Sequence, residues 1–139
     1  MVYMPPGTRR SRRGAAAVEM ALLTPLLAFL CVISVDFARI FYHSQTVANC
    51  ARNGAVYGSQ NPTAANDTSG IKTAAQMDAS NIDLKNLGVT SKTDSSTNPT
   101  YVDVTASYTF TTITKYPGVP TSTNVVRTVR MSVTPWTPN

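Results

Sequence analysis

The feature that most constrains this chain is an apolar run at residues 15–35, which reads AAAVEMALLTPLLAFLCVISV. The run contains a single charged side chain, Glu19. A helix needs about 20 apolar residues to cross the hydrocarbon core of a bilayer, so this run is just long enough. Pro25 lies inside the run, and membrane helices tolerate a proline kink better than soluble helices do. The run therefore predicts a membrane-spanning helix.

A cluster of arginines lies directly before the apolar run. The chain has a formal net charge of +5, and four of its positive charges come from Arg9, Arg10, Arg12 and Arg13. The other Lys and Arg residues nearly balance the seven Asp and Glu residues, so we predict no nucleic-acid partner. Because basic residues beside a membrane helix stay in the cytoplasm, we expect a cytoplasmic N-terminus.

An amphipathic pattern continues beyond the predicted span. Apolar and small residues recur at three- and four-residue spacing, and we expect helix packing to involve Pro25, Phe37, Phe41, Val47 and Ala51. A continuous helix from residue 15 to about residue 57 is roughly 65 Å long, about twice the thickness of the hydrocarbon core. Its second half must therefore leave the membrane and pack against another part of the protein.

The pattern after this helix predicts a small mixed domain. Residues 63–70 are polar and predict a loop, while residues 71–87 predict a second, shorter helix capped by Gly88. Residues 102–110 and 124–133 alternate between apolar and polar side chains, which predicts two strands. Two strands alone bury little surface, so we expect them to cover the apolar stripe of the long helix.

These elements place the chain in the α+β class. We expect a long N-terminal transmembrane-plus-stalk helix, a second short helix and a small antiparallel sheet. The basic leader has no apolar periodicity and is expected to be removed. The predicted boundaries are 1–14 for the leader peptide, 15–60 for the long hydrophobic helix (membrane span 15–35, amphipathic extension 36–58) and 61–139 for a small extracytoplasmic α+β domain.

Residue types that carry catalysis or bind cofactors are sparse in this sequence. The single histidine, His43, has no second ligand at metal-binding spacing. The sequence contains no glycine-rich phosphate loop and no nucleophile elbow. We therefore predict no catalytic residue, no metal site, no cofactor and no enzymatic activity.

The junction between the leader and the apolar run carries the most informative motif. Gly14 follows the arginines, and the run then begins at Ala15 with an acid, Glu19, at its fifth position, which is the pattern of a type IV prepilin. Cleavage after Gly14 gives Ala15 a free, largely protonated amine. An unpaired Glu19 in hydrocarbon is costly, so the amine of a neighbouring subunit is one candidate partner. The alternative is that Glu19 lies at the level of the cytoplasmic headgroups.

The N-terminal third resembles the TadE-like pseudopilins of the tight-adherence (Flp) pilus system. The resemblance covers residues 12–58 and rests on RRGAAAVEMALLTPLLAFL and FARIFYHSQTVANCARNGAVYG, which contains the small-residue signature Ala51-Arg52-Asn53-Gly54-Ala55. Met20 stands where the family normally has an aromatic residue. The resemblance therefore leaves open whether the chain is a TadE-like, a TadF-like or a related minor pseudopilin.

This resemblance implies a type IV pilin-like fold and a role in assembly. An aspartyl prepilin peptidase would cut between Gly14 and Ala15, and Glu19 would serve recognition or assembly. The implied partners are this peptidase, other pilins and pseudopilins, the pilus assembly platform and inner-membrane lipid. The implied location is the bacterial inner membrane with a periplasmic C-terminal domain, and the pilus or cell surface after assembly. The alternatives are a pseudopilin of a secretion system and a signal-anchored extracytoplasmic binding domain.

Overall fold

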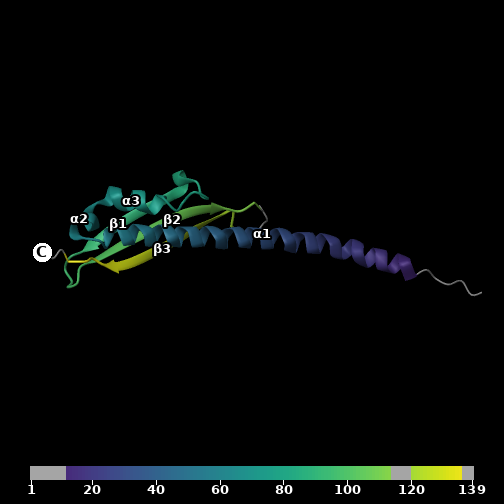
Figure 1. Ribbon diagram of the computed structural model, residues 1–139. Coiled ribbons are helices and arrows are strands. Elements are labelled where there is room, and N and C mark those ends of the chain that lie inside the picture. The colour runs from purple at the N-terminus through teal and green to yellow at the C-terminus, as the bar shows by residue number, and fades with distance from the viewer. Residues whose placement is uncertain (1–11, 114–119, 136–139) are drawn as a thin grey trace, which may run out of the picture. The chain divides into compact units, whose positions relative to one another are not determined.

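A computed structural model describes residues 12–113 and 120–135, with side chains from residue 14 onward (Figure 1). The chain is α+β, with a long N-terminal helix, shorter helices and an antiparallel sheet, which confirms the predicted fold class. The helices are α1 (Arg12–Gly58), α2 (Pro62–Asn66), α3 (Thr68–Gln76) and the short 3-10 helix η1 (Leu84–Asn86). The strands are β1 (Leu87–Asp94), β2 (Tyr101–Thr111) and β3 (Ser122–Ser132).

The chain divides into two units, Met1–Val35 and Asp36–Asn139, and the first contains the N-terminal part of α1. Its large apolar side chains face outward, and Leu22 is 72% exposed. The hydroxyls of Thr24 and Ser34 donate to main-chain carbonyls one turn earlier, so their polar groups are satisfied within the helix. This part of α1 is apolar and long enough to cross a membrane.

The second unit is built on a three-stranded antiparallel sheet with the strand order β1-β2-β3. The central strand β2 alternates strictly, and its inward residues Val102, Val104 and Ala106 are fully buried. The C-terminal part of α1 packs against this face of the sheet, and α3 covers the β1 side (Figure 1). The side chains between these layers form the core of the unit.

Small residues allow α1 to lie close to the sheet. Cys50, Ala51 and Ala55 are fully buried on the face of α1 that meets β2. A Cβ atom built on Gly54 would lie 3.0 Å from Cγ1 of Val104, closer than side chains normally pack. The helix therefore approaches the strand at a distance that only the smallest side chains permit.

The predicted second helix is wrong in its extent, and the predicted polar loop is wrong. The helix ends at Gln76 instead of continuing to residue 87, and Gly88 lies in β1 opposite Ser107 instead of capping a helix. Apart from Asp67, residues 63–70 lie within α2 and the start of α3. Two side chains explain these short helices, because Asn61 accepts from the main-chain N–H of Ala64 and Asp67 accepts from that of Gly70.

Candidate processing and assembly site

The Gly14–Ala15 bond lies in the first turn of α1, which begins at Arg12. Both residues are exposed, and a Cβ atom built on Gly14 would meet nothing within 4 Å. The first four N–H groups of a helix have no intrahelical acceptor, so the first turn unwinds more easily than any interior turn. The bond therefore lies at an exposed end of the helix that few main-chain hydrogen bonds hold.

The predicted leader charges lie only partly within the described residues. Arg12 and Arg13 belong to the first turn of α1, whereas Arg9 and Arg10 lie outside the described residues. Their sequence position still gives the helix its basic flank.

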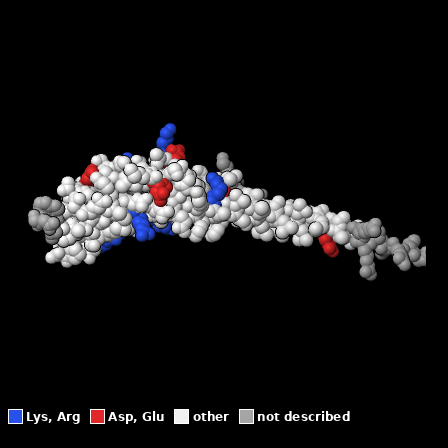
Figure 2. Space-filling model, in the orientation of Figure 1, with Lys and Arg blue, Asp and Glu red and all other residues white. Residues whose placement is uncertain are grey.

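Glu19 is an exposed carboxylate on an otherwise uncharged stretch of α1. Its neighbours on the helix surface are large and apolar, including Met20 at 65% exposed and Leu23 at 47% exposed. Across the described side chains, no basic group lies within ion-pair distance of Glu19. Figure 2 shows this part of the helix as a nearly uncharged surface. A carboxylate on such a surface is costly in lipid unless it finds a partner or reaches the headgroup level.

The residues predicted for helix packing lie in different environments. Val47 and Ala51 are fully buried against the sheet, whereas Phe37 and Phe41 are 71% and 60% exposed. Pro25 is exposed within the apolar part of α1. The structure therefore brings the first pair into the core of the second unit and leaves the two phenylalanines on its surface.

Sequence analysis missed a polar cluster at the start of the second unit. Asp36 is buried, and its Oδ1 accepts from the main-chain N–H of Ile113 at 3.2 Å and from the guanidinium of Arg39 at 3.3 Å. The Arg39 guanidinium also lies 5.1 Å from the centre of the Phe110 ring, which packs against His43. This cluster ties the end of β2 to α1. The signal available in the sequence was an acid directly after the apolar run.

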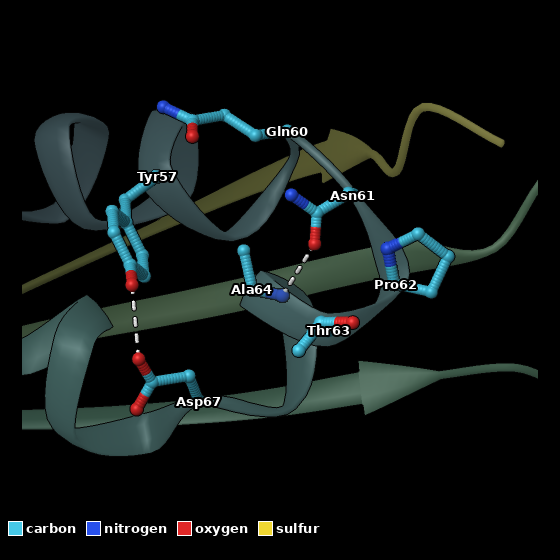
Figure 3. A pocket seen from close by; sticks show the side chains of 7 residues that line it. All are labelled: Tyr57, Gln60, Asn61, Pro62, Thr63, Ala64 and Asp67. Carbon is cyan, nitrogen blue, oxygen red and sulfur yellow. Dashed lines mark hydrogen bonds between the residues drawn. The ribbon is translucent and has the colours of Figure 1, made fainter. Parts of the chain in front are cut away.

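An open pocket of about 700 Å³ lies at the other end of the second unit, and Figure 3 shows its seven lining side chains. Polar groups that line the pocket form hydrogen bonds with one another and with the main chain. The Tyr57 hydroxyl donates to Asp67 at 2.9 Å, and Asn61 accepts from the main-chain N–H of Ala64 at 2.8 Å. Neither bond leaves a group positioned as a nucleophile or as a general base.

Asp67 connects α1 to the start of α3 beside this pocket. Its carboxylate accepts from the Ser69 hydroxyl, from the main-chain N–H of Gly70 and from Tyr57. These hydrogen bonds favour the ionised form and lower the pKa of Asp67 from 3.8 to about 2. A side chain at position 70 would overlap both Asp67 and Tyr57, so this contact requires glycine. The pattern is that of a structural cap. Within the described residues, no three His, Cys, Asp or Glu side chains are grouped as a metal site.

Comparison with known proteins finds a family model that matches the N-terminal region. Residues 14–56 match the model of a family described as TadE-like protein, which confirms the resemblance inferred from the sequence. No curated protein and no solved structure matches the chain. The matched residues contain Glu19, the whole apolar run and the small-residue face that packs on the sheet. Together with the apolar helix, the match supports a membrane protein associated with tight-adherence pili.

Proposed function

We propose that this TadE-like chain is a membrane-anchored minor pilin or pseudopilin that acts in the assembly of tight-adherence pili. A prepilin peptidase cuts between Gly14 and Ala15, and the mature chain then begins at the apolar helix. The N-terminus lies in the cytoplasm and the domain of residues 61–139 lies in the periplasm. The helix holds the subunit in the inner membrane until the subunit associates with other pilins on the assembly platform.

The observation that carries this proposal is the position of Glu19. It lies five residues into the helix that would follow cleavage, on an exposed apolar surface, and has no basic partner among the described side chains. A carboxylate in hydrocarbon is expensive, and the protonated amine of Ala15 on a neighbouring subunit would offset that cost. One ion pair would then set the register of two adjacent helices.

Leaving the bilayer requires new contacts for the apolar side chains of α1. Lipid tails are as apolar as these side chains, so helix association in the membrane depends on close packing and polar pairing. Residues 15–17 are all alanine, which allows helices to approach closely beside Glu19. Assembly would therefore exchange lipid contacts for contacts between helices, with the ion pair providing specificity.

A comparison of two substitutions within the span tests this role. We expect Glu19→Ala to insert into the membrane normally and to reduce pilus assembly sharply, because the helix loses its single charged partner. Thr24→Ala is the matched control, since the Thr24 hydroxyl is satisfied within its own helix by the Met20 carbonyl at 2.6 Å. Piliation would be counted by electron microscopy, with membrane fractionation as the insertion control. Normal piliation in the Glu19→Ala strain would remove Glu19 from the mechanism.

A further inference from the structure

Three large apolar side chains are exposed where the second unit begins. Phe37 and Phe41 lie one helical turn apart on α1 and are 71% and 60% exposed, and Ile113, just beyond β2, is 63% exposed. We call these three residues the proximal apolar surface. Exposed aromatic side chains at successive turns of a helix are costly in water unless another phase or partner covers them.

Covalent connection places this surface close to the end of the apolar run. Phe37 is two residues beyond Val35, so their Cα atoms cannot be more than about 7 Å apart, whatever the orientation of the second unit. Phe41 lies about 6 Å farther along the helix. The interfacial layer of a bilayer is about 5–8 Å thick on each side of the hydrocarbon core. Both rings therefore fall within or beside that layer when the run at residues 15–35 spans the membrane.

Hydrogen bonds bring Ile113 to the same end of the unit. Its main-chain N–H donates to Oδ1 of Asp36 at 3.2 Å, and Asp36 directly precedes Phe37. The adjacent main-chain N–H of Thr112 donates to the Thr121 carbonyl at 3.1 Å, which closes the base of the connection between β2 and β3. Asp36 is buried, so this attachment is part of the folded unit.

A shallow groove of about 420 Å³ extends the apolar surface onto β3. Its apolar lining comes from Phe37, Ile40 and Phe41 of α1 and from Val125 and Val126 of β3, and the polar residues Ser44, Asn124 and Arg127 complete it. Its residues come from both layers of the second unit, and the two phenylalanines form one side. Apolar residues of β3 therefore lie beside the proximal apolar surface.

We propose that the proximal apolar surface docks the second unit onto the interfacial layer of the bilayer that its own helix spans. The occupant is lipid, at the boundary between headgroups and acyl chains. Aromatic and aliphatic side chains are stable at this depth, and Ile113, just beyond the end of β2, adds a second point of contact beside the helix. Two points of contact restrict the tilt of the unit. This inference rests on the membrane anchoring in the proposed function.

Depth measurements on spin labels in the full-length chain test the docking. The background carries Cys31→Ser and Cys50→Ala, and single cysteines are introduced by Ile113→Cys, Leu26→Cys or Thr63→Cys. Each variant is labelled with a nitroxide and reconstituted into phosphatidylcholine–phosphatidylglycerol vesicles. Collision with oxygen and with a water-soluble nickel chelate then reports the depth of each label. Leu26 lies in the predicted span, and Thr63 is an exposed residue of α2, far from the proximal apolar surface in the sequence.

We expect the label at position 26 in hydrocarbon, the label at 113 in the interfacial layer and the label at 63 in water. Adding Phe37→Ser and Phe41→Ser should raise the nickel accessibility of the label at 113 severalfold. Val56→Ser, which changes another exposed apolar residue of α1, should leave that accessibility unchanged.

Three results would overturn the docking, and they are distinguishable. A label at 113 as accessible as that at 63, with position 26 in hydrocarbon, would overturn the docking and leave the anchor intact. A water-accessible label at 26 would overturn the anchor itself. Shielding at 113 that grows with the protein-to-lipid ratio would identify a second copy of the chain as the occupant in place of lipid.

Discussion

The two halves of α1 are opposite in burial and in side-chain size. In residues 14–35 the large residues are exposed, as Leu22 and Leu27 are at 72% and 60%. In residues 36–58 the buried residues are small, and Cys50 and Ala55 have no exposed surface. The same helical geometry therefore serves two purposes. The first half presents apolar bulk to its surroundings, and the second half allows a sheet to approach.

This difference shows where the missing contacts must come from. A buried Leu normally touches many other side chains, so the exposed leucines of the first half need lipid or neighbouring helices to supply those contacts. The small residues of the second half have their partners within the chain, since Gly54 and Gly58 face Val104 and Val102. The first half depends on its environment for these contacts, whereas the sheet-facing residues of the second half find them within the chain.

The largest expected effect is a difference in stability between two truncations. One removes a large side chain of β2 that packs against the second half of α1, and the other removes a large side chain of the first half. Phe110 is 2% exposed and packs beneath Arg39 and beside His43. We expect Phe110→Ala to lower the free energy of unfolding of the second unit by about 3–5 kcal/mol through the lost contacts and the cavity. Leu26→Ala, in the first half, should change it by less than about 0.5 kcal/mol. Near-ultraviolet circular dichroism of the full chain in detergent, followed through urea unfolding, measures both.

Enlarging a small residue of the second half should give the next largest effect. Gly54→Leu forces atoms into the space of Val104 and Ile71, and overpacking of this kind costs about 1–3 kcal/mol. The higher helix propensity of leucine acts in the opposite direction and does not remove the clash. Asn49→Leu, on an exposed position of the same helix, is the matched control. Equal unfolding midpoints for these two variants would contradict close packing of α1 on the sheet.

The smallest expected effect concerns Asp67, which caps the N-terminus of α3 and accepts a hydrogen bond from Tyr57 near the end of the second half. The pKa of Asp67 is about 2 in the folded chain and 3.8 without its partners, so its ionised form stabilises the fold above pH 4. That contribution is lost as the pH falls from about 4 to about 2. We expect Asp67→Asn to be less stable than the parent by a constant amount above pH 5, and the gap to close below pH 4. A gap independent of pH across this range would show that the charge does not matter.

Much of this architecture could be predicted because periodic patterns reflect local geometry. The long helix follows from an unbroken apolar run and a stripe with helical spacing, and β2 follows from the alternation of apolar and polar side chains at residues 102–110. β1 could not be predicted in the same way. Its apolar residues Leu87 and Val89 are followed by Ser91 and Thr93, and its hydrogen bonds come from pairing with β2. Such pairing is a tertiary contact with only a weak local signal.

The extent of the second helix was mispredicted for a related reason. Ala79 and Ile82 are buried at positions that also fit a helical stripe, yet both lie beyond the end of α3 in turns. Asn81 holds this segment by donating to the Thr46 hydroxyl of α1 at 2.7 Å, a contact between residues far apart in the sequence. Burial at helical spacing therefore identified the correct core residues but the wrong secondary structure.

The residues at the start of α1 could be predicted from the sequence, whereas the contact at the start of the second unit could not. Gly14 and Glu19 were recognisable because a charge in an apolar run needs an explanation, and the structure adds their exposure and the absence of a basic partner among the described side chains. The attachment of Ile113 to Asp36 was not recognisable, because it joins residues 77 positions apart through a main-chain donor. Residue type does not indicate which main-chain N–H will donate such a hydrogen bond, because every residue except proline has one.

Determining the N-terminus of the mature protein tests most directly the central claim, which is that the mature chain begins at Ala15. Intact-protein mass spectrometry would compare the chain expressed with and without a prepilin peptidase, with Gly14→Leu as the variant that removes the small residue at the junction. The account predicts a chain beginning at Ala15 only when the peptidase is active and position 14 is glycine. A chain that keeps its arginines beside an active peptidase, or that begins beyond Val35, would contradict it.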